Sequence, residues 1–186
     1  IDQFIDRTFA RAKSFFGKGL VAHVGFGKPV CAAITNALET VINELNIPYQ
    51  IGGTYLAMEG PQFSSLAESN LYRSWGCDVV GMTNMPEAKL AREAEICYAT
   101  VAMVTDYDCW KPDFEQVSVD TVLAALLNNA DKARNVVKLV VPALLRCPRP
   151  CPEGCNTALD SAIITPDSAR DPNMVKRLSA IAGRVL

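Results

Sequence analysis

Short apolar segments rich in β-branched residues alternate with longer amphipathic segments of helical period, and this alternation limits the possible folds more than any other feature of the sequence. The strand-like segments cover residues 19–26, 49–60, 78–83 and 96–105. The helical segments cover residues 29–46, 64–76, 85–95, 118–143 and 173–186. Because strands that alternate with helices usually belong to βαβ units, the sequence predicts an α/β fold in which helices flank a largely parallel or mixed β-sheet.

Size and charge narrow the class of protein further. The chain has 186 residues, of which 49% are hydrophobic and 20% charged, so residues 1–186 are expected to form one globular α/β domain. The net charge of −2 gives no electrostatic reason to expect binding to nucleic acid or to a membrane. No apolar run approaches the roughly 20 residues of a membrane helix, and no signal peptide is recognisable. The sequence therefore predicts a cytoplasmic protein.

Three of the seven cysteines lie in the segment CPRPCPEGC. Its prolines indicate a non-helical connection over residues 147–156, before a helical tail over residues 157–186. These three cysteines could bind a metal ion together with His23, the only histidine, but zinc ligands usually come as two separated C-x2-4-C pairs. The preferred prediction is that no metal binds and that Cys147, Cys151 and Cys155 are structural, either free or occasionally disulfide-bonded. The remaining cysteines are interpreted as scattered buried thiols: Cys31, Cys77, Cys97 and Cys109.

Polar or aromatic side chains follow three of the predicted strands. Asp106 and Asp108 end the apolar run ICYATVAMVT, Met82 and Thr83 follow DVVG, and residues 59–64 follow TYLAM. In open α/β sheets, ligands bind beyond the carboxyl ends of the strands. The three strand ends are therefore predicted to form a single pocket.

The two aspartates have two interpretations. A carboxyl group that is partly desolvated near a second carboxylate favours its neutral form and can donate a proton to a leaving nitrogen. Two such groups also match the hydrogen-bonding edge of adenine. Alternatively, Asp106 and Asp108 only cap the loop, as aspartates commonly do. Their spacing leaves both interpretations open.

The other candidates also have a structural and a functional interpretation. Phe63 could stack on a flat ring or belong to the core. Thr83 could bind an anion at a helix start or simply cap that helix, and the lone His23 could be a base or ligand, or a structural or surface residue. One helix face with i, i+3, i+4 spacing could pack in the core or line a small apolar pocket; it carries Val119, Val122 and Leu123.

Four longer segments together resemble a known family. GGTYLAMEGPQFSSLAES, GMTNMPEAKLA, ICYATVAMVTDYDCW and the opening IDQFIDRT are similar to the S-methyl-5′-thioadenosine phosphorylases of the trimeric purine nucleoside phosphorylase family. Order and spacing agree from Ile1 to about Leu145, and several long motifs in register are more specific than a single glycine pattern. The resemblance implies a nucleoside phosphorylase-like fold and a phosphorolysis that converts methylthioadenosine to adenine and 5-methylthioribose 1-phosphate. It implies no cofactor, since inorganic phosphate is a co-substrate.

The resemblance also implies a role for each candidate. Asp106 would act as the acid or hydrogen-bond donor at the purine N7, and Asp108 would bind the 6-amino group. Phe63 and Ser64 would contact the base, the backbone of Met82 the ribose, and Thr83 the phosphate. The methylthio pocket would be lined by Val119, Val122, Leu123 and, from a neighbouring subunit of a trimer, His23.

Two positions bear on the choice of base. Relatives that prefer 6-oxopurines carry asparagine at the position of Asp106 and glutamate at that of Ser64. The resemblance therefore implies a preference for 6-aminopurines, because a misplaced buried hydrogen bond costs on the order of a few kcal/mol.

The sequence also departs from that family. The glycine-rich phosphate loop and an arginine–histidine segment near phosphate are absent, so the chain resembles the C-terminal part of such an enzyme. A companion chain or further residues are expected to supply the rest, and without them a sheet edge and an apolar face would be exposed. Two alternatives are a purine nucleoside or methylthioinosine phosphorylase of the same family, and a non-catalytic purine-binding fragment.

Overall fold

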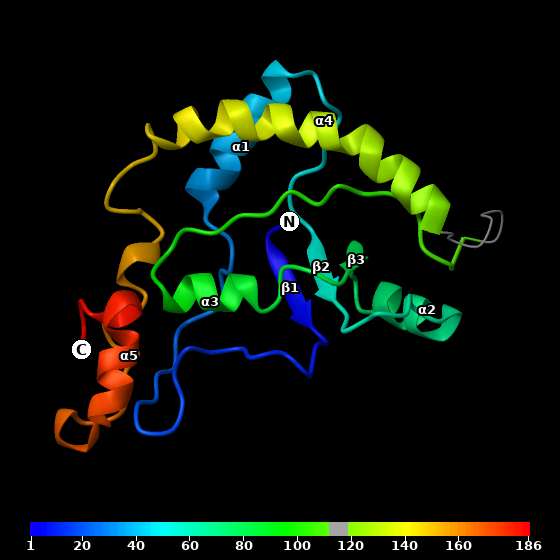
Figure 1. Cartoon of the computed structure of the whole chain (residues 1–186). Coiled ribbons are helices and arrows are strands. Elements are labelled where there is room, and N and C mark those ends of the chain that lie inside the picture. Colours follow the sequence, from blue (N-terminus) through cyan, green and yellow to red (C-terminus); the bar gives the residue numbers. More distant parts are fainter. Residues whose placement is uncertain (112–118) are drawn as a thin grey trace.

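The computed structural model of this chain describes residues 1–111 and 119–186. In the first turns of the long helix it describes the backbone, while five side chains there lie outside the description: Val119, Thr121, Val122, Ala124 and Asn128. Within the described residues, a central parallel sheet is flanked by α-helices (Figure 1). This confirms the predicted α/β class.

The sheet consists of β1 (Gln3–Asp6), β2 (Thr54–Ala57) and β3 (Val79–Gly81), which are paired in that order and are all parallel. β2 is the central strand, and its residues Tyr55, Leu56 and Ala57 are buried. Since the three strands are parallel, their carboxyl ends meet at one edge of the sheet. The loops that begin after β1, β2 and β3 therefore start beside one another.

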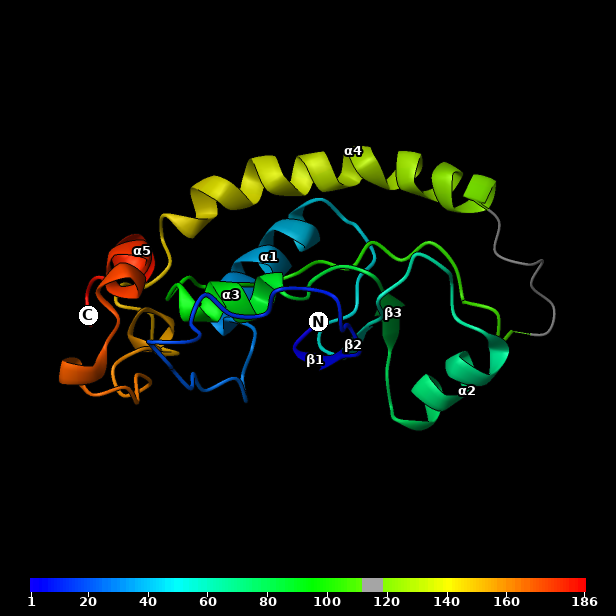
Figure 2. The ribbon, with the colours of Figure 1, turned by 60° about the horizontal axis from the view of Figure 1, so that its bottom comes forward.

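Helices follow each strand along the chain. α1 (Ala32–Glu44), α2 (Leu66–Ser74) and α3 (Glu87–Glu93) come after β1, β2 and β3, respectively. The long α4 (Val119–Leu144) packs on α1, and α5 (Pro172–Ala182) follows two short 3₁₀ turns at Cys155–Thr157 and Asp167–Ala169. Figures 1 and 2 place α2 and α5 at opposite ends of the molecule, with α4 spanning much of the distance between them.

The C-terminal tail packs against the N-terminal loop. Phe16 and Leu20 of that loop share a buried apolar cluster with Leu159, Met174 and Leu178. A separate cluster joins α1 to α4, and a third surrounds β2 and α3. The tail is thus attached to the rest of the chain through a small core of its own.

Two of the predicted strands do not form. Near residues 19–26 the structure has isolated bridges, between Gly17 and Leu20 and between Ala22 and Ile163. Residues 96–105 pair with no strand among the described residues. A strand needs a neighbour that pairs along its length, and an apolar, β-branched composition does not supply one. Conversely, β1 was not predicted, because IDQFID is short and does not alternate clearly.

Large apolar side chains remain exposed, mainly on α4 and on the extended segment beneath it. Among them are Leu126, Leu127, Val137, Val141 and Val104. Exposed apolar surface is typical of sites that contact other protein, and it agrees with the apolar face expected from the sequence. None of the described helices combines the length and apolar character required to cross a membrane.

A capping box begins α2 beside two predicted site residues. The Ser65 hydroxyl accepts a hydrogen bond from the Glu68 N–H, and the Glu68 carboxylate accepts one from the Ser65 N–H at 2.8 Å. These bonds satisfy backbone donors that a helix start otherwise leaves unpaired. Phe63 and Ser64 come directly before this N-cap. The capping box therefore also fixes the direction in which the chain at these two residues approaches α2.

Ser65→Ala is expected to lower the free energy of unfolding by about 1 kcal/mol, because it removes the N-cap acceptor. Urea denaturation of both proteins measures this difference. Ser179→Ala is the matched control, since the Ser179 hydroxyl donates to the Lys176 carbonyl within α5 and caps no helix start. Equal losses in the two variants would contradict the capping role.

Candidate active site

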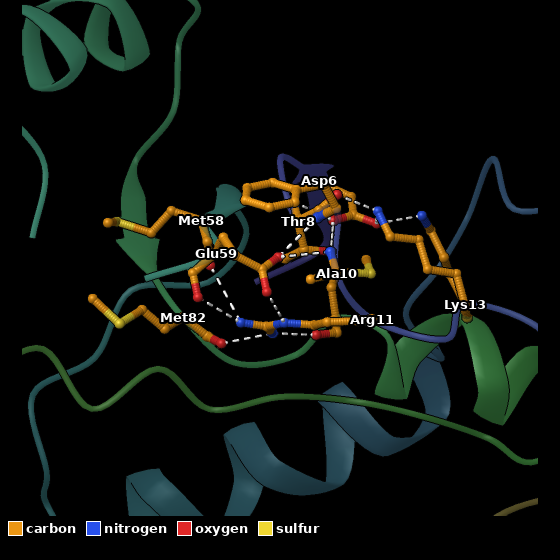
Figure 3. A network of polar contacts seen from close by, with 11 residues as sticks. Asp6, Thr8, Ala10, Arg11, Lys13, Met58, Glu59 and Met82 are labelled. Atoms are coloured by element: carbon orange, nitrogen blue, oxygen red, sulfur yellow. Dashed lines mark hydrogen bonds and ion pairs between the residues drawn. The ribbon is translucent and has the colours of Figure 1, made fainter. Parts of the chain in front are cut away.

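The side chain of Arg11 connects the ends of β2 and β3 (Figure 3). Its guanidinium donates hydrogen bonds to the carbonyl oxygens of Glu59, at 3.0 Å, and Met82, at 2.8 Å. Further bonds reach the carbonyls of Met85, at 2.5 Å, and Met58, at 3.5 Å. Since the guanidinium is planar and has five donors, this one side chain holds the two loops in a fixed relation.

The Glu59 carboxylate joins the loop after β1 to the same network. It accepts hydrogen bonds from the backbone N–H groups of Phe9, at 2.7 Å, and Ala10, at 3.4 Å. Its other oxygen lies 3.6 Å from the Arg11 Nε. The Phe9 N–H, aided by the Arg11 charge, holds the pKa of Glu59 below its ordinary value against a smaller effect of desolvation. Glu59 is therefore ionised at neutral pH.

Asp6, the last residue of β1, anchors α3 to the sheet. Its carboxylate accepts hydrogen bonds from Lys89 of α3, from the Lys13 Nζ at 3.0 Å, and from the hydroxyl and N–H of Thr8 at 2.6 and 2.9 Å. Burial alone would raise the pKa of Asp6, but the two lysines and Thr8 together hold it well below the usual range. The end of β1 is thus a tightly partnered negative charge.

Thr83, the predicted phosphate residue, is held at the end of β3 by Tyr55. Its N–H donates to the Tyr55 hydroxyl at 3.3 Å, and the two hydroxyl oxygens are 3.2 Å apart. The Tyr55 hydroxyl passes so close to Gly81 that a Cβ there would lie 2.0 Å from it. Gly81 therefore allows Tyr55 to reach the exposed Thr83.

The loop with the two aspartates lies next to the loop of Phe63 and Ser64. The Cys109 thiol donates to the Ser64 carbonyl, with Sγ and O 3.4 Å apart, and the Ser64 hydroxyl lies 3.5 Å from the Met58 sulfur. The Phe63 ring is 53% exposed, so the interpretation of Phe63 as a core residue is wrong. These contacts connect two of the three predicted strand-end segments directly.

Asp106 has a structural role in its own loop. Its carboxylate accepts hydrogen bonds from the Thr105 hydroxyl at 2.6 Å and from the Asp108 N–H at 2.9 Å. The second bond forms an Asx turn, and Asp108 has the left-handed φ of 59° that such tight turns favour. A carboxylate has about four acceptor positions, so this turn leaves the half-buried Asp106 free to contact a ligand as well.

The remaining predicted residues lie apart from this edge or outside the description. His23 is exposed, and its backbone N–H donates to the Ala162 carbonyl at 2.8 Å, within the region packed against the tail. Leu123 is 52% exposed on α4, so it does not belong to the core. Val119 and Val122 lie in the same helix, but their side chains are outside the described residues.

A cavity lies at the opposite edge of the sheet from these loops. It has a volume of about 840 Å³ and is lined by Gly53 and Asp78, just before β2 and β3, by residues 100–104, and by parts of α1 and α4. Its position at the amino ends of the strands disagrees with the strand-end site. We favour the carboxyl edge for chemistry, because parallel sheets bind ligands there and the loops that carry Ser64, Met82 and Thr83 begin there.

Four cysteine sulfurs form a cluster that the sequence did not predict. The Sγ atoms of Cys31, Cys97, Cys151 and Cys155 all lie within 4.8 Å of one another. Cys147 is not among them, because its thiol donates to the Ala33 carbonyl at 3.7 Å. The interpretation of Cys31 and Cys97 as scattered thiols is therefore wrong, and among the described residues these four are the ones that could hold a metal ion.

The thiols of this cluster differ in acidity. Burial would raise the pKa of Cys151, but the backbone N–H groups of Cys155 and Glu153 outweigh it and lower that pKa to about 7. Burial, followed by the hydrogen bond with Cys151, raises the pKa of Cys155 to about 11. Burial likewise raises the pKa of Cys97. The geometry thus favours a thiolate at Cys151.

Sequence reasoning missed the residues that hold the strand-end loops. Arg11, Asp6 and Tyr55 have partners 28 to 83 residues away in the chain, and several of these partners are backbone carbonyls. No local pattern marks such an arginine or tyrosine. Only the position of Asp6 at the end of a strand could have indicated its role, and that strand was not predicted.

Comparison with known proteins settles the family. Residues 1–142 match the phosphorylase superfamily. The chain belongs to this superfamily. It is 64% identical to S-methyl-5′-thioadenosine phosphorylase from Rhodospirillum rubrum over 185 residues, covering 100% of this chain and 63% of the relative. It is 57% identical to the enzyme of the same name from Cereibacter sphaeroides, of which it covers 64%.

Solved structures agree with this assignment of the phosphorylase fold. A methylthioadenosine phosphorylase from an antarctic soil metagenomic library superimposes with a TM-score of 0.87 at 43% identity, covering 97% of this chain and 63% of that one. The Schistosoma mansoni enzyme in complex with adenine has a TM-score of 0.79 at 30% identity, covering 87% and 64%. The chain thus spans less than two thirds of the length of these relatives.

Asp6→Asn is expected to lower the free energy of unfolding by about 2 kcal/mol at neutral pH, because two lysines and Thr8 lose a charged acceptor. The folded-state pKa of Asp6 is lowered, so its contribution is present above the ordinary pKa near about 4 and is lost as the pH falls below it. The difference between the two proteins should therefore shrink on acidification. Denaturation at a series of pH values measures this.

The matched control is Asp131→Asn on α4. The Asp131 side chain is 81% exposed and pairs with Arg134 three residues on, so its loss should change stability little at any pH. A pH-independent difference for Asp6→Asn would contradict the assigned ionisation.

Proposed function

We propose that this chain provides the nucleoside-binding part of a methylthioadenosine phosphorylase, which cleaves methylthioadenosine with inorganic phosphate to adenine and 5-methylthioribose 1-phosphate. The observation that carries the proposal lies at the carboxyl edge of a phosphorylase-superfamily sheet. There Cys109, in the loop of the two aspartates, contacts Ser64, and Arg11 joins the loops after β2 and β3. The names of the relatives, methylthioadenosine phosphorylases at 64% and 57% identity, support this substrate. Purine and methionine salvage is the corresponding metabolic role.

The loop of the aspartates and the loop of Phe63 would form the base site. The leaving adenine gains negative charge as the bond to C1′ breaks, so a proton or hydrogen bond from Asp106 to N7 would lower the barrier. Asp108 would accept from the 6-amino group. The exposed ring of Phe63 could pack on the base, with Ser64 along its edge. Asp106 and Ser64 are the residues that would favour adenine over 6-oxopurines.

The ends of β2 and β3 would hold the sugar and the phosphate. The backbone of Met82 would contact the ribose hydroxyls, and Thr83 would bind phosphate through its hydroxyl. Arg11 holds the Met82 carbonyl at 2.8 Å, so it would act as a positioning residue. Fixed groups of this kind stabilise the transition state without reorganisation during the reaction.

The complete site would need more than this chain. We expect a trimer in which His23 reaches the neighbouring subunit's methylthio pocket, lined by Val119, Val122 and Leu123. The exposure of His23 and Leu123 is compatible with this. Most of the phosphate contacts would come from a companion chain or from the further length that the relatives have. No cofactor is expected, and the enzyme would act in the cytoplasm.

The test is to incubate the natural full-length protein with methylthioadenosine, with and without inorganic phosphate, and to follow adenine release. Release that requires phosphate would support the proposal. Faster turnover of inosine or methylthioinosine would favour the 6-oxopurine alternative. Adenine binding without any release would indicate a non-catalytic purine-binding protein.

Asp106→Ala should lower kcat/KM by roughly 10²- to 10⁴-fold, because the leaving base loses its acid or hydrogen-bond donor. Steady-state kinetics with methylthioadenosine measures the loss. Asp131→Ala, which removes an exposed carboxylate on α4, is the control and should retain the activity. A change of less than about threefold in Asp106→Ala would show that its role is limited to the Asx turn.

A further inference from the structure

The cysteine cluster is the most unusual chemical feature of the structure outside the strand-end site. Four thiols from three separate parts of the chain lie within 4.8 Å of one another, and two of them, Cys31 and Cys155, are buried with 1% of their surface exposed. All seven cysteines of the chain are free thiols in this structure. Neither the proposed reaction nor the packing of the apolar clusters requires four thiols to meet.

The four sulfurs are close enough together to surround one metal ion. Zinc–thiolate bonds of about 2.3 Å place tetrahedral sulfurs about 3.8 Å apart, and the Sγ atoms of Cys31 and Cys151 are 3.7 Å apart. A disulfide requires about 2.05 Å and joins thiols in pairs. Here all four sulfurs converge, so the spacing fits one central ion better than two bonds.

The backbone around the cluster is held in place by hydrogen bonds. The Cys31 N–H donates to the Tyr98 carbonyl at 2.8 Å, which places Cys31 beside the segment of Cys97. The Cys151 N–H donates to the Asn156 side chain at 3.0 Å, and the Gly154 N–H donates to the Cys151 carbonyl at 3.0 Å. The ligand positions are therefore preorganised, which lowers the entropy cost of binding an ion.

The cluster lies at a junction of the fold. Cys31 is the N-cap residue of α1, Cys97 follows α3, and Cys151 and Cys155 belong to the connection between α4 and the tail. The tail also packs on the N-terminal loop and is bound by Glu95, which follows α3, through the Leu159 N–H and Arg184; the cysteine cluster lies beside these attachments. An ion here would cross-link three segments that are distant in sequence.

We propose that Cys31, Cys97, Cys151 and Cys155 bind one Zn²⁺ ion in a structural site. The ion would hold the tail, residues 157–186, against the helices that flank the sheet. Zinc is the ion that four thiolates in tetrahedral geometry favour. With four protein ligands no position stays open for water or substrate, so the site is structural rather than catalytic. Each ligand exchanges its S–H bond for a Zn–S bond, and the released protons pass to the solvent. This differs from the prediction of no metal made from the sequence.

The first test measures zinc in the natural full-length protein, purified under reducing conditions without chelator. We expect about one zinc per chain by elemental mass spectrometry, and about none in Cys97→Ser and Cys155→Ser. Cys147→Ser is the matched control, because Cys147 lies in the same connection but outside the group of four, with its thiol donating to the Ala33 carbonyl; this variant should keep its zinc. Zinc content that is equal in Cys97→Ser and Cys147→Ser would overturn the proposal.

A second measurement needs no variant. In the zinc-bound protein, Cys31, Cys97, Cys151 and Cys155 should resist alkylation and become reactive together after a chelator removes the ion, with a fall in Tm. Peptide mass mapping identifies the alkylated residues. Absence of zinc, together with a mass lower by two hydrogens for each disulfide formed among these cysteines, would overturn the proposal. Activity is not the readout, so this result is independent of the proposed function.

Discussion

The guanidinium of Arg11, fixed against backbone carbonyls beyond β2 and β3, is the interaction on which the candidate active site depends. Beyond the end of a parallel strand, backbone carbonyls no longer accept hydrogen bonds from the neighbouring strand. Where such carbonyls are buried, another donor has to bond to them. Arg11 supplies that donor to both loops, and the ionised Glu59 holds Arg11 and the loop after β1 in turn. The strand ends are thus held by charge-assisted hydrogen bonds rather than by apolar packing.

This arrangement separates the residues that build the site from those that would contact a ligand. Arg11, Asp6 and Tyr55 are engaged with the protein, whereas Phe63 and Thr83 are exposed at the same edge. Preorganised groups need such support to keep their geometry when a ligand binds. The exposed apolar side chains of α4 are compatible with the proposal that further protein completes the site.

Local sequence patterns predicted the helices better than the strands. The period of α1 and α4 and the serine cap of α2 are properties of nearby residues, and all three helices form close to their expected limits. The apolar run over residues 96–105 has the composition of a strand but lacks a pairing partner among the described residues. For Phe63 the sequence left a ligand contact and a place in the core open, since aromatic residues are often buried, and only the structure shows that Phe63 is exposed.

The sequence by itself determined the α/β class and the superfamily, since both follow from the order and spacing of segments along the chain. It also identified the strand ends as the place for polar groups. Only the tertiary structure decided which of these groups meet. Cys31 and Cys151 are 120 residues apart in the chain, and Arg11 and Met82 are 71 apart. Contacts of this range depend on how the whole chain packs, and they leave no periodic trace in the local sequence.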